Sequence, residues 1–363
     1  MCAVLTSRYA GAKQGHSLEE LHAMTIWERL QTNDWTLEIV TLSFTLGYVF
    51  LFMVGDYYNK SKVSLFLAGI APTMKKNFYQ FGTSANELYI KDSAENFASY
   101  ASGRVNIESV KIKFSLQPRH NIFIWFFEFL LSFFTNSVPT PQDKVDIVIK
   151  PSVEYDNFIS GVVAKIGMND VRQENYYLSL TKTTDSDNLP PYFVYMGEVN
   201  EFQEKLTTPE IKSVLNNQET PKFLKFFAFT DQSSEKPFAI KQCYPQRKII
   251  LSTYLTSNKN QLKQLNLLLD ALFNLVDKLA AKEISFRPES LKKIVKTREV
   301  EISKIQKLLD QKKQEEIEYE KAKLKKQERE SIRKLSKEEQ IKFEKKQLEK
   351  EKKKMQRKQK VRM

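Results

Sequence analysis

The sequence is poor in the residues that build most catalytic and metal sites. Its 363 residues include 2 cysteines, 3 histidines and 10 glycines. Cys2 and Cys243 lie far apart in the chain, which excludes a disulfide framework and a cysteine zinc site. A histidine metal site or catalytic triad has too few members, and the glycine-rich nucleotide motifs GxGxxG and GxxxxGK[ST] are missing. We therefore expect no cofactor, no metal ion and no enzymatic activity.

One stretch near the N-terminus is long and apolar enough to cross a membrane. Residues 35–55 carry a single charge, Glu38, and a spanning helix needs about 20 mostly apolar residues. Tyr57 and Tyr58 follow it, as expected for an aromatic belt at the membrane surface. The alternative is a buried helix of a soluble domain. The residues expected to face lipid are Trp35, Leu37, Ile39, Phe44, Leu46, Tyr48, Phe50, Phe52 and Val54.

The charges that flank this stretch predict its orientation. Glu28, Arg29, Asp34 and Glu38 stand at or before its start, whereas Lys60, Lys62, Lys75 and Lys76 follow it. The basic side is expected to be cytosolic, and the preceding residues lack the apolar run of a signal peptide, so the span itself would be the signal anchor. We divide the chain into a short lumenal arm at 1–34, a transmembrane helix at 35–55, a juxtamembrane segment at 56–76, a cytosolic domain at 77–287 and a helical tail at 288–363.

The cytosolic region reads as an α+β domain. Alternating apolar residues predict strands at 110–116 and 145–150, and we expect further strands at 158–165, 192–196, 222–229 and 248–255. Helical patterns cover 169–180 and 200–217, and the loop 183–191 separates them. The leucine repeat at 258–279 is consistent with a coiled coil, but its wide apolar stripe favours a helix that packs on the sheet. Within the juxtamembrane segment, residues 63–70 predict a short helix that lies near the membrane surface, either separate from the span or continuing it.

A second apolar stretch interrupts the predicted strands. Residues 121–134 are nearly all large and apolar, with Glu128 in the middle, and are too short to span a bilayer comfortably. They predict either a core helix or a helix that faces the membrane or a membrane partner. The residues expected on such a face are Phe123, Trp125, Phe126, Phe127, Phe129, Leu130 and Phe133.

The positive charge is concentrated at the C-terminus. The net charge is +13, and residues 312–363 hold 21 Lys/Arg against 11 Glu. Proline and glycine are missing after Pro288, which predicts one long basic helix or coiled coil. The end is either a solubilising segment or a binding site for phosphate, in rRNA or anionic lipid. The candidate phosphate-binding residues are Lys345, Lys346, Lys350, Lys352, Lys353, Lys354, Arg357, Lys358, Lys360 and Arg362.

Five short motifs, taken with this order of parts, point to a family. They are Ser102-Gly103-Arg104-Val105, Lys113-Phe114, Pro118-Arg119, Met196-Gly197-Glu198-Val199 and Phe229-Thr230-Asp231-Gln232. Together the motifs and the architecture resemble the calumin family, the coiled-coil-domain-containing subunit of the PAT (protein associated with the translocon) complex in the endoplasmic reticulum. The resemblance covers roughly residues 36–363.

The resemblance implies a non-enzymatic role in membrane-protein biogenesis. Family members sit in the ER membrane beside the Sec translocon and act with a small partner, Asterix, as an intramembrane chaperone for multispanning client proteins. Their basic helical end reaches toward the ribosome. One departure is clear: the acidic lumenal segment to which calcium binding is attributed in animal members has no counterpart before Trp35. Calcium binding is therefore not carried over.

Two competing functions stay open beside this one. The chain would act as a simple tether if it linked the ER membrane to ribosomes or RNA without acting on clients. An enzyme would require a perturbed acid pair in a pocket, for example Asp156 with Asp170.

Overall fold

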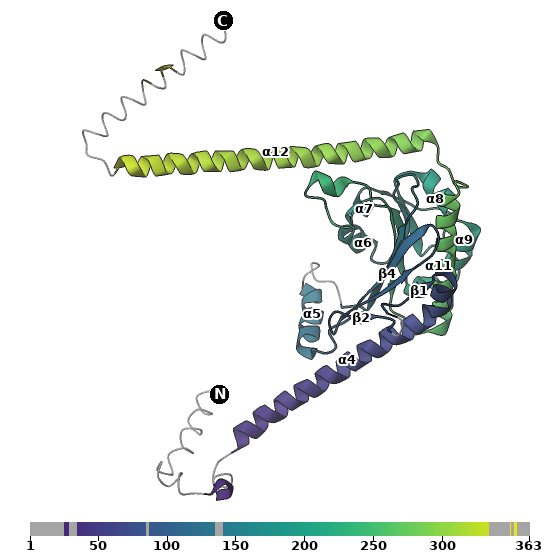
Figure 1. Cartoon of the computed structure of the whole chain (residues 1–363), viewed down its shortest axis with the longest axis vertical. Helices are drawn as coiled ribbons and strands as arrows, with labels where there is room; N and C mark the ends of the chain where they lie inside the picture. Colours follow the sequence, from purple (N-terminus) through teal and green to yellow (C-terminus); the bar gives the residue numbers. More distant parts are fainter. Residues whose placement is uncertain are drawn as a thin grey trace. The chain divides into compact units, whose positions relative to one another are not determined.

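The structure is a computed structural model that describes residues 25–28, 35–84, 87–134, 141–333, 349 and 352–353. The chain divides into two compact units. Residues 1–234 and 245–291 form the first unit, and residues 235–244 and 292–363 form the second. Figure 1 labels the elements of both units.

An antiparallel sheet of 10 strands forms the centre of the first unit. The strand order is β1-β3-β4-β5-β10-β9-β6-β8-β7, with β2 paired to β3. The strands are β1 (Gln80–Phe81), β2 (Ile90–Lys91), β3 (Asn96–Ser102), β4 (Ile107–Ser115), β5 (Lys144–Pro151), β6 (Ser160–Ala164), β7 (Lys182–Thr184), β8 (Phe193–Gly197), β9 (Leu224–Thr230) and β10 (Lys248–Tyr254). The predicted α+β class is confirmed, and the six predicted strands are β4, β5, β6, β8, β9 and β10.

Helix α11 (Lys259–Ala280) packs on one face of the sheet and against α4. The Asn258 side chain caps its first turn, and ten of its apolar residues are buried. The predicted packing of this leucine-rich helix within the domain is therefore confirmed. The shorter helices α8 (Asn200–Leu206), α9 (Pro209–Leu215) and α10 (Thr220–Phe223) complete this side of the core.

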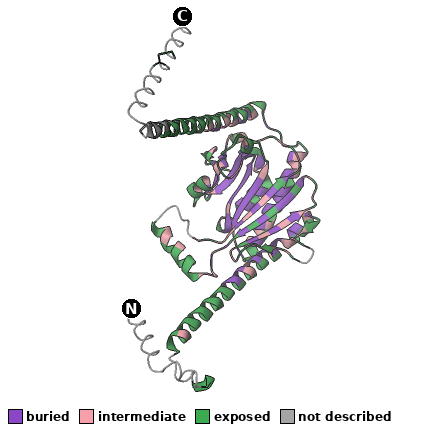
Figure 2. Cartoon of the chain, turned by 60° about the vertical axis from the view of Figure 1, so that its left-hand side comes forward, coloured by how far each residue is buried: buried purple, intermediate pink, exposed green. Residues whose placement is uncertain are grey.

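Two short helices cover half of the opposite face. Helices α6 (Met168–Glu174) and α7 (Tyr176–Ser179) bury Val171, Tyr177 and Leu178 against residues of β6, β8, β9 and β10. The other half of this face is formed by β3, β4 and β5. Because no such helices cover it, buried and exposed residues alternate along these strands (Figure 2).

Helix α4 runs without a break from Thr36 to Asn77 and passes through Pro72. Its first half is exposed, whereas Val63, Phe66, Leu67 and Ile70 are fully buried. The Phe66 ring meets the Phe114 ring of β4 edge to face at 5.6 Å. The prediction of a surface-lying helix at 63–70 is therefore wrong, because these apolar side chains form part of the core.

The loop before β8 differs from expectation, whereas the described part of the tail is helical as predicted. Part of the predicted loop at 183–191 pairs with β8 as strand β7. In the second unit, the short 3₁₀ helix η1 spans Ile240–Cys243, and most of helix α12 (Pro288–Arg333) follows. The apolar stripe of α12 is its less exposed face: Leu291, Ile294, Ile302, Ile305 and Leu309 are buried or half-buried. Of the candidate phosphate-binding residues, only Lys352 and Lys353 lie among the described residues, and both are exposed.

Candidate membrane-facing site

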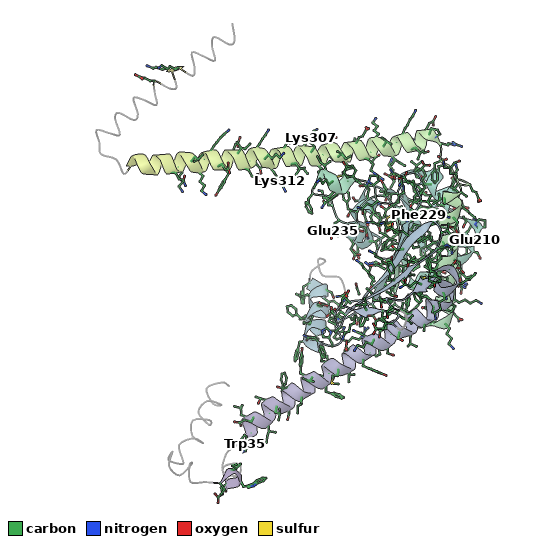
Figure 3. All side chains as sticks on the ribbon, viewed as in Figure 1. Trp35, Glu210, Phe229, Glu235, Lys307 and Lys312 are labelled. Atoms are coloured by element: carbon green, nitrogen blue, oxygen red, sulfur yellow. The ribbon has the colours of Figure 1, made fainter. Side chains whose placement is uncertain are left out.

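The exposed half of α4 presents a continuous apolar surface. Every residue predicted to face lipid between Trp35 and Val54 is exposed, from 36% for Tyr48 to 66% for Phe44 and Phe50. An 18-residue window of this helix has a mean hydropathy of 2.0, and none of the window is buried. Figure 3 shows the side chains that follow Trp35 projecting outward along this part of α4. The helix is therefore long and apolar enough to cross a membrane, and the alternative of a buried helix is wrong.

Helix α5 (Ile122–Phe134) is apolar around its whole circumference, and none of its residues is buried. Of the predicted face, Trp125 is half-buried and Phe123, Phe126, Phe127, Phe129, Leu130 and Phe133 are exposed (Figure 2). A core helix would hide most of these side chains, so the core interpretation is wrong. Such a concentration of exposed aromatic residues marks a surface that contacts lipid or another protein.

One ring contact joins the two apolar helices, and a second joins α4 to the segment just before α5. The Phe123 ring lies 6.5 Å from the Phe44 ring, and the His120 ring lies edge to face with the Phe52 ring at 5.3 Å. Phe44 precedes Phe52 by eight residues, which corresponds to about 12 Å along a helix axis. Residues 120–123 therefore run beside α4 toward its N-terminal end.

A polar network fixes the chain where α4 enters the domain. Arg119 donates to both carboxylate oxygens of Asp143 at 2.8 Å and to Asn59 Oδ1 at 3.0 Å. Asn59 Nδ2 in turn donates to the carbonyl oxygen of Gln117 at 3.2 Å. We call Asn59, Gln117, Arg119 and Asp143 the Arg119 network. It joins α4, the loop after β4 and the segment before β5.

Gly55 permits this close approach. A Cβ atom at Gly55 would lie 2.4 Å from the carbonyl oxygen of Arg119, well inside the van der Waals limit. The Trp125 indole also donates to Gln117 Oε1 at 3.2 Å, which links the first turn of α5 to the same network. The glycine, the network and the tryptophan together position α5 against α4.

The one acidic residue of α5 faces polar surroundings. Glu128 lines a pocket of about 300 Å³ with Lys144, Lys225 and Tyr254. A carboxylate on an otherwise apolar helix is expensive in hydrocarbon, so its position beside this pocket removes the conflict with a membrane-facing role. Neither Asp156 nor Asp170 lines this pocket, and no group of three or more metal-ligating side chains occurs among the described residues.

The motifs quoted for the family resemblance are structural. Gly103 has a φ of 91°, which suits glycine, in the turn between β3 and β4. Arg104 of the same motif donates to Asp277 of α11 at 2.7 Å. Glu198 accepts from the backbone nitrogen of Ile159 at 2.9 Å, and the Thr230 hydroxyl accepts from the backbone nitrogen of Gln232 at 3.0 Å. With Arg119, these contacts hold turns and layers together rather than form a reaction site.

Sequence reasoning missed the Arg119 network. Pro118-Arg119 was visible as a motif, but Asn59 and Asp143 lie 60 and 24 residues away from Arg119 in the sequence. The only local signal was an arginine immediately before an apolar helix.

Taken together, the fold and the site define an α+β protein with one candidate membrane-spanning helix and a second, shorter apolar helix beside it. The chain matches the family model described as PAT complex subunit CCDC47 over residues 34–354. It therefore belongs to this family, and the predicted resemblance is confirmed.

Curated relatives agree with this placement. The chain is 27% identical over 333 residues to the endoplasmic reticulum membrane protein YNR021W of Saccharomyces cerevisiae, with 82% of this chain and 81% of the relative covered. It is also 27% identical over 297 residues to the endoplasmic reticulum membrane protein C2G5.01 of Schizosaccharomyces pombe, with 79% of each covered. Among solved structures, the mycobacterial trehalose monomycolate transport factor A has a TM-score of 0.24 and 11% identity over 50% of this chain and 76% of that one. A likeness at this level supports no functional conclusion.

Proposed function

We propose that this protein is an ER membrane-protein biogenesis factor that acts with an Asterix-like small membrane protein as an intramembrane chaperone. Its clients would be multispanning proteins that emerge at the Sec translocon beneath a bound ribosome. Its role is non-enzymatic and needs no cofactor. The observation that carries this proposal is the pair of exposed apolar helices, α4 and α5, held together by the Arg119 network.

The depth of α5 follows from its contact with α4. If Gly55 lies at the cytosolic boundary, Phe44 is eleven residues or about 16 Å deeper along the helix, close to the bilayer midplane. The ring contact between Phe44 and Phe123 supports a position of Phe123 in the cytosolic leaflet. Helix α5 has 13 residues, about 20 Å, which is too short to cross the bilayer. It would therefore stay within the cytosolic half of the bilayer.

This arrangement suits the shielding of a client helix. A second apolar helix beside the span widens the surface that one membrane anchor would offer. Glu128 of α5 and the polar pocket that it lines would lie at the edge of the leaflet. A partly hydrophilic client helix would there find apolar contacts together with a polar border.

The topology and the tail complete the proposal. The N-terminus is lumenal, because the basic flank of α4 lies on its C-terminal side. The lysine- and arginine-rich end contacts ribosomal RNA phosphates, including through Lys352 and Lys353. This tail carries 21 Lys/Arg against 11 Glu, so its contact should weaken as salt rises.

The competing function is a tether that binds ribosomes or RNA through the basic tail and does not act on client proteins. The charge of the tail alone favours it. Native purification from digitonin-solubilised microsomes, with and without residues 352–363, separates the two functions. Recovery of the Sec translocon and a small membrane partner in both cases, with ribosomes lost only without the tail, supports the biogenesis role. Recovery of ribosomes alone through the tail supports the tether, and recovery of nothing contradicts both.

A further inference from the structure

On the sheet face that carries α6 and α7, the half formed by β3, β4 and β5 is bordered by α5 at Ser115 and Lys144, and no other helix described in the first unit covers it. On β4, Val110, Ile112 and Phe114 are buried, whereas the intervening Lys111 and Lys113 are exposed. On β5, the exposed Lys150 follows the buried Ile149 in the same way. The β3-β4-β5 half of the face is therefore polar and open, in contrast to the half beneath α6 and α7.

Four lysines gather on this open half. Ile249 pairs with Ile149 in the antiparallel β10–β5 ladder, so the neighbouring Lys248 lies opposite Lys150. Lys150 is also opposite Ser109 of β4, and Lys111 is opposite Val148 of β5. Directly opposed residues have Cβ atoms about 5 Å apart. We call Lys111, Lys113, Lys150 and Lys248 the lysine face.

The positive charge of the lysine face is poorly neutralised. Lys150 forms an ion pair with Glu108 at 2.7 Å. Lys113 lies opposite Asp146 of β5, which pairs with Lys144 instead, and Lys111, Lys113 and Lys248 form no ion pair with any residue that the structure describes. Partial burial, followed by repulsion from Lys150, Lys111 and Lys113, lowers the pKa of Lys248. Such a cluster of like charges disfavours the folded state, and a bound polyanion would relieve the repulsion.

The lysine face extends along the sheet toward the end remote from the membrane helix, where Lys150 and Lys248 lie. The membrane-side end of β4 is Ser115, which leads into the Arg119 network beside Gly55. Lys150 pairs with Ser109, six residues before Ser115 or about 20 Å along the strand, whereas Lys111 and Lys113 are about 13 and 7 Å from Ser115. The Debye length in cells is only about 8 Å, so lipid headgroups on the bilayer that α4 would cross are out of range of Lys111, Lys150 and Lys248. The partner must come from the cytosol.

We propose that the lysine face binds the sugar-phosphate backbone of RNA, as a second polyanion contact separate from the tail. Lysine is depleted in protein–protein interfaces, whereas nucleic-acid interfaces are strongly positive, which favours RNA over an acidic protein. Among the described residues of β3, β4 and β5, Tyr100 is the one aromatic residue on this face, opposite Lys111. The contact therefore reads phosphates rather than base sequence. This inference rests on the proposed role beside a ribosome.

The test measures binding of the full-length protein in digitonin to a fluorescent RNA duplex of arbitrary sequence over a range of salt concentrations. The test variant replaces Lys111, Lys113, Lys150 and Lys248 with glutamine. A control variant replaces four exposed lysines elsewhere on the first unit: Lys75, Lys182, Lys259 and Lys263. A second control replaces the lysine face with arginines, which retain the charge. Thermal unfolding checks that each variant is folded.

We expect the glutamine variant to lose affinity about ten-fold near physiological salt and to reduce the slope of log K against log salt by about 2. Both controls should retain the wild-type slope, and UV crosslinking of native ribosome-bound protein should label peptides from β4, β5 or β10. The proposal is overturned if the glutamine variant keeps the wild-type slope, or if poly-glutamate competes as well as RNA. Loss of ribosome recovery on tail truncation is a separate result, so the proposed function can stand if the lysine face fails.

Discussion

Arg119 and Asp143 form a two-pronged ion pair, with each guanidinium nitrogen 2.8 Å from its own carboxylate oxygen. Arg119 also reaches Asn59 on α4 and stacks over the Tyr58 ring at 5.2 Å. One side chain thus joins the membrane-helix candidate to the loop that leads into α5. Lysine cannot reproduce this fork, because it offers a single point charge.

Arg119→Lys is therefore expected to destabilise the first unit by about 2 kcal/mol, since the partly buried Asp143 loses its paired contacts. Urea unfolding of the detergent-solubilised protein measures the change. Lys222→Ala breaks the exposed pair with Glu219 and should change stability by less than about 1 kcal/mol. Equal effects of the two substitutions would contradict the role assigned to Arg119.

Gly55→Ala is expected to destabilise the junction of α4 with the domain by about 1–3 kcal/mol, because the new Cβ collides with backbone that must shift. Gly47 of the same helix provides the control, since no atom lies within 4 Å of a Cβ placed there. Gly47→Ala should leave the domain unaffected. Limited proteolysis in detergent compares the two variants, and unchanged resistance of Gly55→Ala would show that the backbone approach is not required.

Glu201 holds the start of α12 to α8. Its carboxylate accepts from Ser290 Oγ at 2.6 Å and from the Arg287 backbone nitrogen at 3.1 Å. Hydrogen bonds from Lys205 and then Ser290 lower the pKa of Glu201 to about 2. Because the folded pKa is below the unfolded value of 4.5, the stabilisation is complete above that value and is lost as the pH falls toward 2.

Glu201→Gln should accordingly lower the unfolding temperature at pH 7, and the gap to wild type should narrow below pH 4.5. Thermal unfolding at pH 7, 5 and 3 measures the gap. A gap that stays constant across this range would show that ionisation of Glu201 does not support the contact.

The membrane position of α5 is tested by cysteine accessibility. In a Cys2→Ser/Cys243→Ser background, Phe127→Cys should react slowly with a membrane-impermeant maleimide in intact microsomes. Ile166→Cys lies in a turn of the domain and is 87% exposed, so it should react quickly. Detergent should make the two sites equally reactive. Rapid labelling of Phe127→Cys in intact membranes would show that α5 faces water.

The sequence predicted the elements whose signals are local. The alternation of apolar and polar residues identified β4 and β5 correctly, and the wide apolar stripe identified α11. Each of these elements has one face packed against the core. Strands β1 and β2 are two residues each and carry no readable period. Residues 63–70 were misplaced at the surface, because their burial depends on α11 and β4, which come later in the chain.

The candidate site shows the same division. The apolar content of α4 and α5 was readable, but their contact depends on Arg119, Asn59 and Asp143, which are brought together only by the fold. The lysine face could not be predicted from the sequence for the same reason, since Lys113 and Lys248 lie on strands far apart in the sequence.

The proposal that α4 and α5 shield client helices is tested most directly by site-specific photocrosslinking during membrane insertion. A photoreactive amino acid is placed at Phe127 on α5, at Phe44 on α4 or at Ile166 as a control, and ribosomes are stalled on a multispanning client with a partly polar helix. We predict client crosslinks from Phe127 and Phe44 and none from Ile166. Ribosome association with no client crosslink from either helix would contradict chaperoning and leave the protein as a tether.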